Sequence, residues 1–246
     1  MTIKKLLVSY ITLGYPNEDD YLKFVKEADA LGTDIFELGY PPKFAKYDGP
    51  LIRSSYLKVK SMYNNFSDLI SYTRNITKKK IIILTYLEGV QNNLDEFLDM
   101  TKASGADGVL FPDLLIDFSE NYSKYLNKIL EKGLDSVVFV SPFVPDKIIS
   151  DVYKFSSPFL YYGVRPTTGV NTPVNVSSLL KRLKNLTNSR VVVGFGLKGL
   201  EEIKEALSAG ADGVAIGSAY VEAFENNGLS GALDVVKMVR DVLDEF

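Results

Sequence analysis

The chain has 246 residues, of which 46% are hydrophobic and 24% charged, with 28 Lys and Arg against 31 Asp and Glu and with no cysteine or histidine. The missing thiol and imidazole exclude disulfides, thiolate nucleophiles, zinc ribbons, iron–sulfur clusters, imidazole metal cages and Ser-His-Asp triads. Acid–base chemistry must therefore use carboxylates, tyrosines or lysines with shifted pKa values. Both signs of charge are spread along the chain without a basic stripe or tail, so neither a nucleic acid nor an anionic membrane is expected as a partner.

The first segment predicts a buried strand rather than a targeting signal. Two lysines precede an apolar run, as in a signal peptide, but Ser9, Tyr10 and Thr12 interrupt that run and no small-residue cleavage site follows. No apolar run reaches the ~20 residues that a membrane span needs. We therefore expect a cytoplasmic protein without a membrane segment.

Short apolar runs rich in Ile, Val and Phe alternate with longer segments of helical period. Such runs are typical of parallel strands covered on both faces, as in repeated βαβ units. The first helical segment begins with a capping residue, Asn17, and an acidic first turn. The predicted strands are Leu6–Ile11, Asp34–Gly39, Ile81–Tyr86, Gly108–Phe111, Ser136–Ser141, Phe159–Gly163, Arg190–Phe195 and Gly213–Ile216.

A repeated Gly-X-Asp junction separates a helical segment from the next strand at four places. Glycine readily adopts the left-handed conformation that ends a helix, so each junction predicts a helix end that leads into a strand. The four glycines are Gly32, Gly105, Gly133 and Gly210. Eight strands without a linker favour a closed barrel over a doubly wound sheet, so we predict an α/β fold, a single (β/α)8 TIM barrel domain over residues 1–246.

Glu37 is the first candidate for chemistry, because a barrel of this kind places its active site at the C-terminal ends of the strands. Within its strand, alternation puts Glu37 opposite Phe36 and Leu38, toward the barrel axis. A carboxyl group walled by apolar side chains has a raised pKa, which suits a group that donates and accepts protons. The alternative is a structural carboxylate bonded to a neighbouring strand.

Asp48 follows on the loop after the same strand, in an Asp-Gly-Pro sequence. That sequence alone is an ordinary turn, in which the aspartate bonds its own backbone. Asp48 becomes a catalytic candidate because it shares a loop with Glu37.

Glycine-rich sequences at the last three strands predict a phosphate site. Thr168 and Gly169 follow the sixth strand, Gly196 ends the seventh, and Gly217 and Ser218 end the eighth. Glycine lets the backbone approach an anion, and Ser218 would open a short helix with unpaired amide groups. Because barrels commonly bind phosphate at the loops after strands seven and eight, a phosphorylated substrate is expected, although glycines are also common at strand ends.

Other residues are weaker candidates for a functional site. Asp113 and Asp117 are four residues apart, a spacing more typical of a solvated turn or helix cap than of a magnesium site, and we predict no metal. Tyr86 and Tyr161 lie in or at the ends of strands and can reach the pocket, whereas the other tyrosines are expected to pack in the core or at the surface.

Several motifs, taken in order along nearly the whole chain, resemble the tryptophan synthase alpha chain family. The most specific lies around the second strand and its loop. The motifs are Ser9–Pro16, Phe36–Gly39 followed by Asp48–Pro50, Leu84–Tyr86, Gly194–Gly196 and Gly217–Ala219.

The resemblance implies a lyase that cleaves indole-3-glycerol phosphate to indole and glyceraldehyde 3-phosphate in tryptophan biosynthesis. It assigns Glu37 to proton transfer at indole C3, Asp48 to the indole N–H and Tyr161 to substrate orientation. By the same resemblance, the phosphate is bound by Thr168, Gly169, Gly196, Gly217 and Ser218. It implies no cofactor in this chain and a hetero-oligomeric complex with a beta chain that carries pyridoxal phosphate.

The chain departs from the family in four places. Residues 42–47 replace the usual Phe-Ser-Asp-Pro-Leu-Ala run, in a loop that contacts the beta chain in the family. The asparagine expected soon after Tyr86 is absent, and the loop after the sixth strand is about one residue shorter than the resemblance predicts. Because the first predicted strand starts almost at once, we expect a barrel that lacks the extra N-terminal helix of the family. Two alternatives stay open: another phosphate-binding barrel, of the prenyl-glyceryl phosphate synthase or sugar-phosphate isomerase type, and a barrel that mainly activates a partner.

Overall fold

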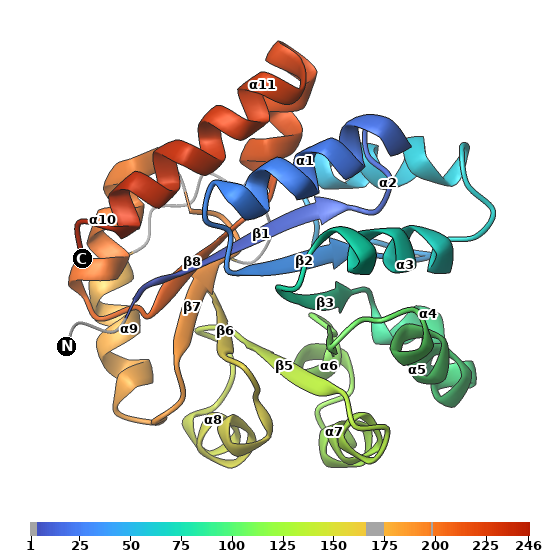
Figure 1. Cartoon of the computed structure of the whole chain (residues 1–246). Helices are drawn as coiled ribbons and strands as arrows, with labels where there is room; N and C mark the ends of the chain where they lie inside the picture. The colour runs from blue at the N-terminus through green and yellow to red at the C-terminus, as the bar shows by residue number, and fades with distance from the viewer. Residues whose placement is uncertain (1–3, 166–174, 198) are drawn as a thin grey trace.

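Eight parallel strands form a closed barrel in the computed structural model, which describes residues 4–165, 175–197 and 199–246. Each strand pairs with the next, and the first pairs with the eighth (Figure 1). Leu6 of the first strand lies opposite Gly213 of the eighth. The predicted TIM barrel is therefore confirmed. The strands are β1 (Leu6–Thr12), β2 (Ile35–Gly39), β3 (Lys80–Leu84), β4 (Gly108–Leu110), β5 (Asp135–Val140), β6 (Leu160–Gly163), β7 (Val191–Gly194) and β8 (Gly213–Ile216).

Helices surround the barrel on its outside, as Figure 1 shows. The α-helices are α1 (Glu18–Ala30), α2 (Pro50–Lys60), α3 (Ser67–Ile76), α4 (Leu87–Val90), α5 (Leu94–Ala103), α6 (Leu114–Asp117), α7 (Tyr122–Glu131), α8 (Asp146–Val152), α9 (Val176–Lys184), α10 (Gly199–Ser208) and α11 (Ser218–Leu243). Two short 3-10 helices, η1 (Gln91–Asn93) and η2 (Tyr153–Phe155), complete the described elements. None of the described helices is both long and apolar enough to cross a membrane.

The predicted strands agree with the observed ones to within two residues at each end. The largest difference is at β3, which ends at Leu84 rather than Tyr86. Thr85 still donates a backbone hydrogen bond to Leu110, but Tyr86 already precedes the first turn of α4. Thr85 and Tyr86 have a high propensity for strand, but the start of α4 ends the strand before them. The Tyr86 side chain therefore belongs to the loop region.

The four Gly-X-Asp junctions are confirmed as helix ends with positive φ. The φ angles are 106° at Gly32, 93° at Gly105, 67° at Gly133 and 100° at Gly210. Asn17 also caps α1 as predicted, accepting a hydrogen bond from the Asp20 amide.

The aspartates of three of these junctions hold the N-terminal ends of neighbouring strands together. Asp34, Asp107 and Asp212 each accept a hydrogen bond from a strand amide, at 3.0, 2.8 and 2.7 Å respectively. Each carboxylate also faces a lysine or arginine side chain. At the N-terminal end of the barrel, backbone groups are therefore hydrogen-bonded and charges are paired. A binding site is accordingly expected at the C-terminal end.

The helix that Ser218 begins is longer than predicted. α11 runs for 26 residues, but Gly228 breaks it with φ 65° and ψ −158°. Only a residue without Cβ takes this conformation easily, so the break makes the segment from Ser218 to Gly228 a short helix of its own.

Candidate active site

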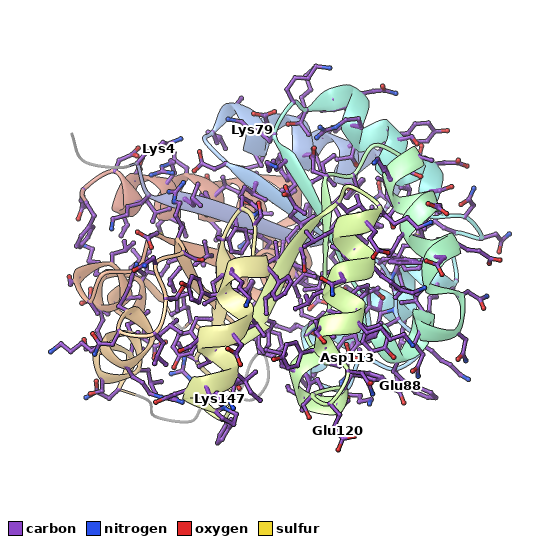
Figure 2. All side chains as sticks on the ribbon, turned by 90° about the horizontal axis from the view of Figure 1, so that it is seen from below. Lys4, Lys79, Glu88, Asp113, Glu120 and Lys147 are labelled. Carbon is purple, nitrogen blue, oxygen red and sulfur yellow. The ribbon has the colours of Figure 1, made fainter. Side chains whose placement is uncertain are left out.

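The predicted site residues that the structure describes line one cavity. The cavity lies at the C-terminal ends of the strands, where a barrel enzyme is expected to react. Figure 2 shows the two ends of the barrel: Lys4 and Lys79, which precede β1 and β3, lie at one edge, and Glu88 and Asp113, which follow β3 and β4, lie at the opposite edge. The predicted residues in the lining are Glu37, Asp48, Tyr161, Gly196, Gly217 and Ser218.

Glu37 lies in the middle of β2 and points into the barrel, as the alternation of its strand predicts. Its side chain is only 2% exposed, and its Oε2 atom has no hydrogen-bond partner among the described residues. Burial, and then the charge of Asp48, raise the pKa of Glu37 to about 8. A structural carboxylate would have its oxygens bonded to neighbours, so the unpaired oxygen favours a group that is free to exchange a proton.

Asp48 is buried beside the same cavity and is not the ordinary solvated turn that its sequence allows. It is 5% exposed, and its Oδ2 accepts a hydrogen bond from the Tyr86 hydroxyl at 3.0 Å. Burial raises the pKa of Asp48 to about 6, against the opposing effects of the Tyr86 hydrogen bond and the Arg53 charge. At pH 7 Asp48 is therefore mainly ionised while Glu37 is mainly protonated, which separates an acceptor from a donor.

Tyr161 reaches the cavity from β6, and its hydroxyl lies over Gly194 on the neighbouring strand. A Cβ atom at Gly194 would lie 2.3 Å from that hydroxyl oxygen, so only glycine fits beneath it. Burial, and then the charge of Glu37, raise the pKa of Tyr161 well above its usual value. The hydroxyl therefore stays protonated and can donate a hydrogen bond.

Tyr10 also lines the cavity, although its sequence pattern predicts no role there. It pairs in register with Glu37, and its ring lies over two strand-end glycines, Gly39 and Gly217. Its hydroxyl is 3.1 Å from the Thr12 hydroxyl. Alternation in the first strand gives the orientation of Tyr10, but its place beside Glu37 required the register between β1 and β2.

The glycine-rich half of the cavity comes from the ends of β7 and β8. Gly196 has φ 105°, and Phe195 before it has φ 59°, which is uncommon for a residue with a side chain. Ser218 begins α11, whose first amide groups have no acceptor within the helix. These features suit an anion. Thr168 and Gly169 lie outside the described residues.

Asp113 is buried, so it is not the solvated turn that its spacing from Asp117 allows. It accepts hydrogen bonds from the amides of Leu87 and Glu88, at 2.8 and 3.0 Å, and so caps α4 from another loop. It is a helix cap, as predicted, but not a solvated one. No group of three or more acidic residues that suits a metal ion occurs within the described ranges.

Tyr86 acts through Asp48 rather than at the cavity wall. Its hydroxyl donates to Asp48 and accepts from the Tyr47 amide at 3.0 Å. Position alone could not assign this role, because it depends on the fold of the loop after β2.

Comparison with known proteins assigns a family to this arrangement. A family model described as "Tryptophan synthase alpha chain" matches residues 2–242. The chain is 50% identical to the tryptophan synthase alpha chains of Sulfurisphaera tokodaii, over 99% of this chain and 100% of that one, and of Saccharolobus solfataricus, over 100% of both. It also superposes on a solved chain from the tryptophan synthase a2b2 complex of Pyrococcus furiosus with a TM-score of 0.79, 25% identity and full coverage of both chains.

The comparisons and the geometry agree. The family model covers nearly the whole barrel, and two relatives share half of their residues with this chain from end to end. The chain therefore belongs to the tryptophan synthase alpha chain family.

Proposed function

We propose that Glu37 and Asp48 carry out the lyase reaction of this family in the present chain. The family cleaves indole-3-glycerol phosphate to indole and glyceraldehyde 3-phosphate, and the chain serves tryptophan biosynthesis as an alpha subunit. One observation carries the assignment of roles: a buried carboxyl group with an unpaired oxygen lies in the same cavity as a second carboxylate of lower pKa.

In this mechanism Glu37 moves both protons. Its protonated carboxyl group donates to C3 of the indole ring, which places positive charge on the ring nitrogen. Glu37, now ionised, accepts the proton of the glyceryl hydroxyl next to the ring. The hydroxyl carbon becomes an aldehyde, the bond between that carbon and C3 breaks, and its electron pair restores the aromatic ring of indole. The carboxyl group returns to its starting protonation state.

Asp48 stabilises the charge that forms on the ring. As a carboxylate it accepts a hydrogen bond from the indole N–H, and this bond becomes stronger as the nitrogen becomes positive. Tyr161 orients the substrate through its protonated hydroxyl. Gly196, Gly217 and Ser218 hold the phosphate at the ends of β7 and β8, and the resemblance adds Thr168 and Gly169 to this set.

The assay for this proposal is indole release from indole-3-glycerol phosphate by the purified chain. Glu37→Gln keeps the shape of the side chain but has no proton to give at C3, so turnover should fall by at least ~100-fold. Glycerol phosphate should still bind, because the phosphate loops are untouched. Ser218→Asp is the matched variant: charge repulsion should weaken phosphate binding while Glu37 remains intact.

Retained turnover in Glu37→Gln would move the proton transfer to another group. Absence of indole from the wild-type chain, alone and with a beta chain, would contradict the lyase assignment and favour a barrel that only activates its partner. The family match rules out the first alternative, that the chain belongs to another class of phosphate-binding barrel.

We further propose that the chain assembles with a beta chain and that pyridoxal phosphate belongs to that partner. The Pyrococcus furiosus relative is described as a mutually activating a2b2 complex. In the present chain, a groove beside the cavity mouth combines an apolar floor with basic side chains. The Phe44–Leu57 groove, as we name it, is lined by Pro42, Lys43, Phe44, Ala45, Lys46, Arg53, Tyr56, Leu57 and Lys60.

Phe44 and Leu57 are 57% and 70% exposed and line the same groove, so together they offer a partner an apolar surface. No acidic side chain is among the described residues that line the groove. The groove therefore fits an apolar segment of the beta chain. We place this assembly in the cytoplasm, because the part of this family in tryptophan biosynthesis suits that compartment.

A further inference from the structure

The loop after β2, which carries Asp48, is fastened to the loops that follow β3 and β4. Lys46 Nζ lies 2.9 Å from a Glu88 carboxylate oxygen and 2.8 Å from an Asp117 carboxylate oxygen. The Tyr47 hydroxyl donates to the other Asp117 oxygen at 2.9 Å. We call these four residues the Lys46–Tyr47 clasp. It joins residues up to 71 positions apart in the sequence.

The clasp continues inward to Asp48. The Tyr47 amide donates to the Tyr86 hydroxyl at 3.0 Å, and that hydroxyl donates to Asp48 Oδ2 at 3.0 Å. The rings of Tyr47 and Tyr86 stack with their centroids 6.1 Å apart. The same hydroxyl therefore binds the backbone before Asp48 and the carboxylate of Asp48 itself.

The opposite side of the loop is held from α2. Arg53 donates from Nε to the Ala45 carbonyl at 2.9 Å and from Nη2 to the Lys46 carbonyl at 2.8 Å. The backbone of residues 45–47 is thus bonded to Arg53 of α2 on one side and to the Tyr86 hydroxyl on the other. An Asp48 carboxylate held in this way keeps one orientation, and reacting groups displaced by 1 Å can lose about 100-fold in rate.

The clasp uses a segment that differs from the run that the family resemblance leads us to expect. Lys46 and Tyr47 belong to this segment, residues 42–47, which comes directly before Asp48. We infer that Lys46 and Tyr47 are positioning residues, which fasten the loop to Glu88 and Asp117 so that Asp48 faces the cavity in the isolated chain. The inference rests on the proposed function, in which Asp48 binds the indole N–H.

Charge gives the clasp a second effect. Glu88 and Asp117 both contact the Lys46 ammonium, so its removal leaves two carboxylates facing the same space. Like charges at short range repel, and the loops after β2, β3 and β4 should then separate. Substitution of Lys46 therefore tests the whole clasp.

The experiment is a double-mutant cycle between Lys46→Met and Asp48→Asn, measured as indole release by the isolated chain. Lys46→Met should lower kcat by ~10- to 100-fold, with KM changed by less than about threefold, because the phosphate loops lie at β7 and β8. Lys46→Arg should restore most of kcat. In the Asp48→Asn background, Lys46→Met should cause no further loss, because the group that it positions is gone.

Lys132→Met is the matched control. It also removes a lysine that pairs with an aspartate, Asp99 at 2.7 Å, but on an exposed surface at the end of α7. Its kcat should equal that of the wild type. Tyr47→Phe is the second variant, which removes only the hydroxyl bond to Asp117 and should lower kcat by about 3- to 10-fold.

The outcomes separate the two proposals. If Lys46→Met and Tyr47→Phe keep wild-type kcat while Asp48→Asn does not, the positioning inference is overturned and the proposed function stands. An equal loss from Lys46→Met with and without Asp48 would show a general structural effect and overturn the inference too. If Asp48→Asn or Glu37→Gln leaves turnover unchanged, the proposed roles of those carboxylates fail.

Discussion

At the residue scale, Glu37 combines two features: its side chain is only 2% exposed, and its Oε2 atom has no hydrogen-bond partner among the described residues. Many surface carboxylates of this chain pair with lysine or arginine, as Asp99 does with Lys132. Alternation along β2 was enough to predict that Glu37 faces the barrel axis. Its pKa could not be predicted as a value, because the shift to about 8 comes from the closed barrel and from Asp48, which lies 11 positions further along the chain.

The pH dependence of turnover should follow these two pKa values. Glu37 must be protonated to donate, so activity should fall as pH rises through about 8. Asp48 must be ionised to accept the indole N–H, so activity should fall as pH drops through about 6. A bell-shaped profile of kcat/KM in the free enzyme, with a plateau between these limits, is expected.

Asp48→Asn provides the control for this profile. An amide cannot titrate, so the acid limb should disappear from the residual activity. The alkaline limb should move to lower pH, because the Asp48 charge no longer raises the pKa of Glu37. A profile whose two limbs are unchanged by Asp48→Asn would contradict the assignment of both groups.

At the element scale, strand-end glycines make room for the tyrosines of the cavity. Gly39 ends β2 beneath the Tyr10 hydroxyl, and Gly194 ends β7 beneath the Tyr161 hydroxyl, each with only 2.3 Å between the oxygen and an added Cβ. From the sequence, only glycines at the ends of the last three strands are predicted to bind an anion. The second use, as space for a ring from the neighbouring strand, required the register of the barrel.

Gly194→Ala should therefore disturb both stability and turnover. The added methyl group overlaps the Tyr161 hydroxyl and the Ala215 side chain, and overpacking of this kind costs about 1–3 kcal/mol of unfolding free energy. Displacement of Tyr161 should also lower kcat. Denaturant unfolding and indole release measure the two effects.

Gly89→Ala is the matched substitution within α4. Its added Cβ would come no nearer than 3.7 Å to another heavy atom, so stability should change by less than about 0.5 kcal/mol. Equal stability for Gly194→Ala and Gly89→Ala would contradict the packing argument.

At the scale of the whole molecule, the two ends of the barrel serve different purposes. The N-terminal end is held by junction aspartates that bind strand amides and basic side chains. The C-terminal end carries the cavity, the clasp and the Phe44–Leu57 groove. The loops at this end can therefore differ from those of relatives without loosening the sheet.

If the beta chain binds the Phe44–Leu57 groove, substitutions in the groove should weaken its stimulation of indole release. Phe44→Ser combined with Leu57→Ser should reduce the stimulation of indole release by a matching beta chain by ~10-fold or more, because exposed apolar anchors dominate binding energy. The rate of the isolated chain should not change. Titration of the beta chain into a fixed amount of the variant measures this effect.

Leu130→Ser is the control, because Leu130 is also exposed but lies near the end of α7 that leads into β5, at the opposite end of the barrel. It should leave the stimulation intact. A double variant in the groove that responds to the beta chain as the wild type does would place the interface elsewhere.

The sequence by itself determined the eight strands, the glycine ends of four helices, the absence of thiol and imidazole chemistry, and the inward direction of Glu37. These features follow from local periodicity and residue type, which need no knowledge of distant contacts. Only the tertiary structure decided that Tyr10 lies beside Glu37, that Tyr86 bonds Asp48, and that Lys46 reaches Asp117. Those contacts, like the pKa values of the two carboxylates, arise when closure of the barrel brings distant residues together and removes water from between them.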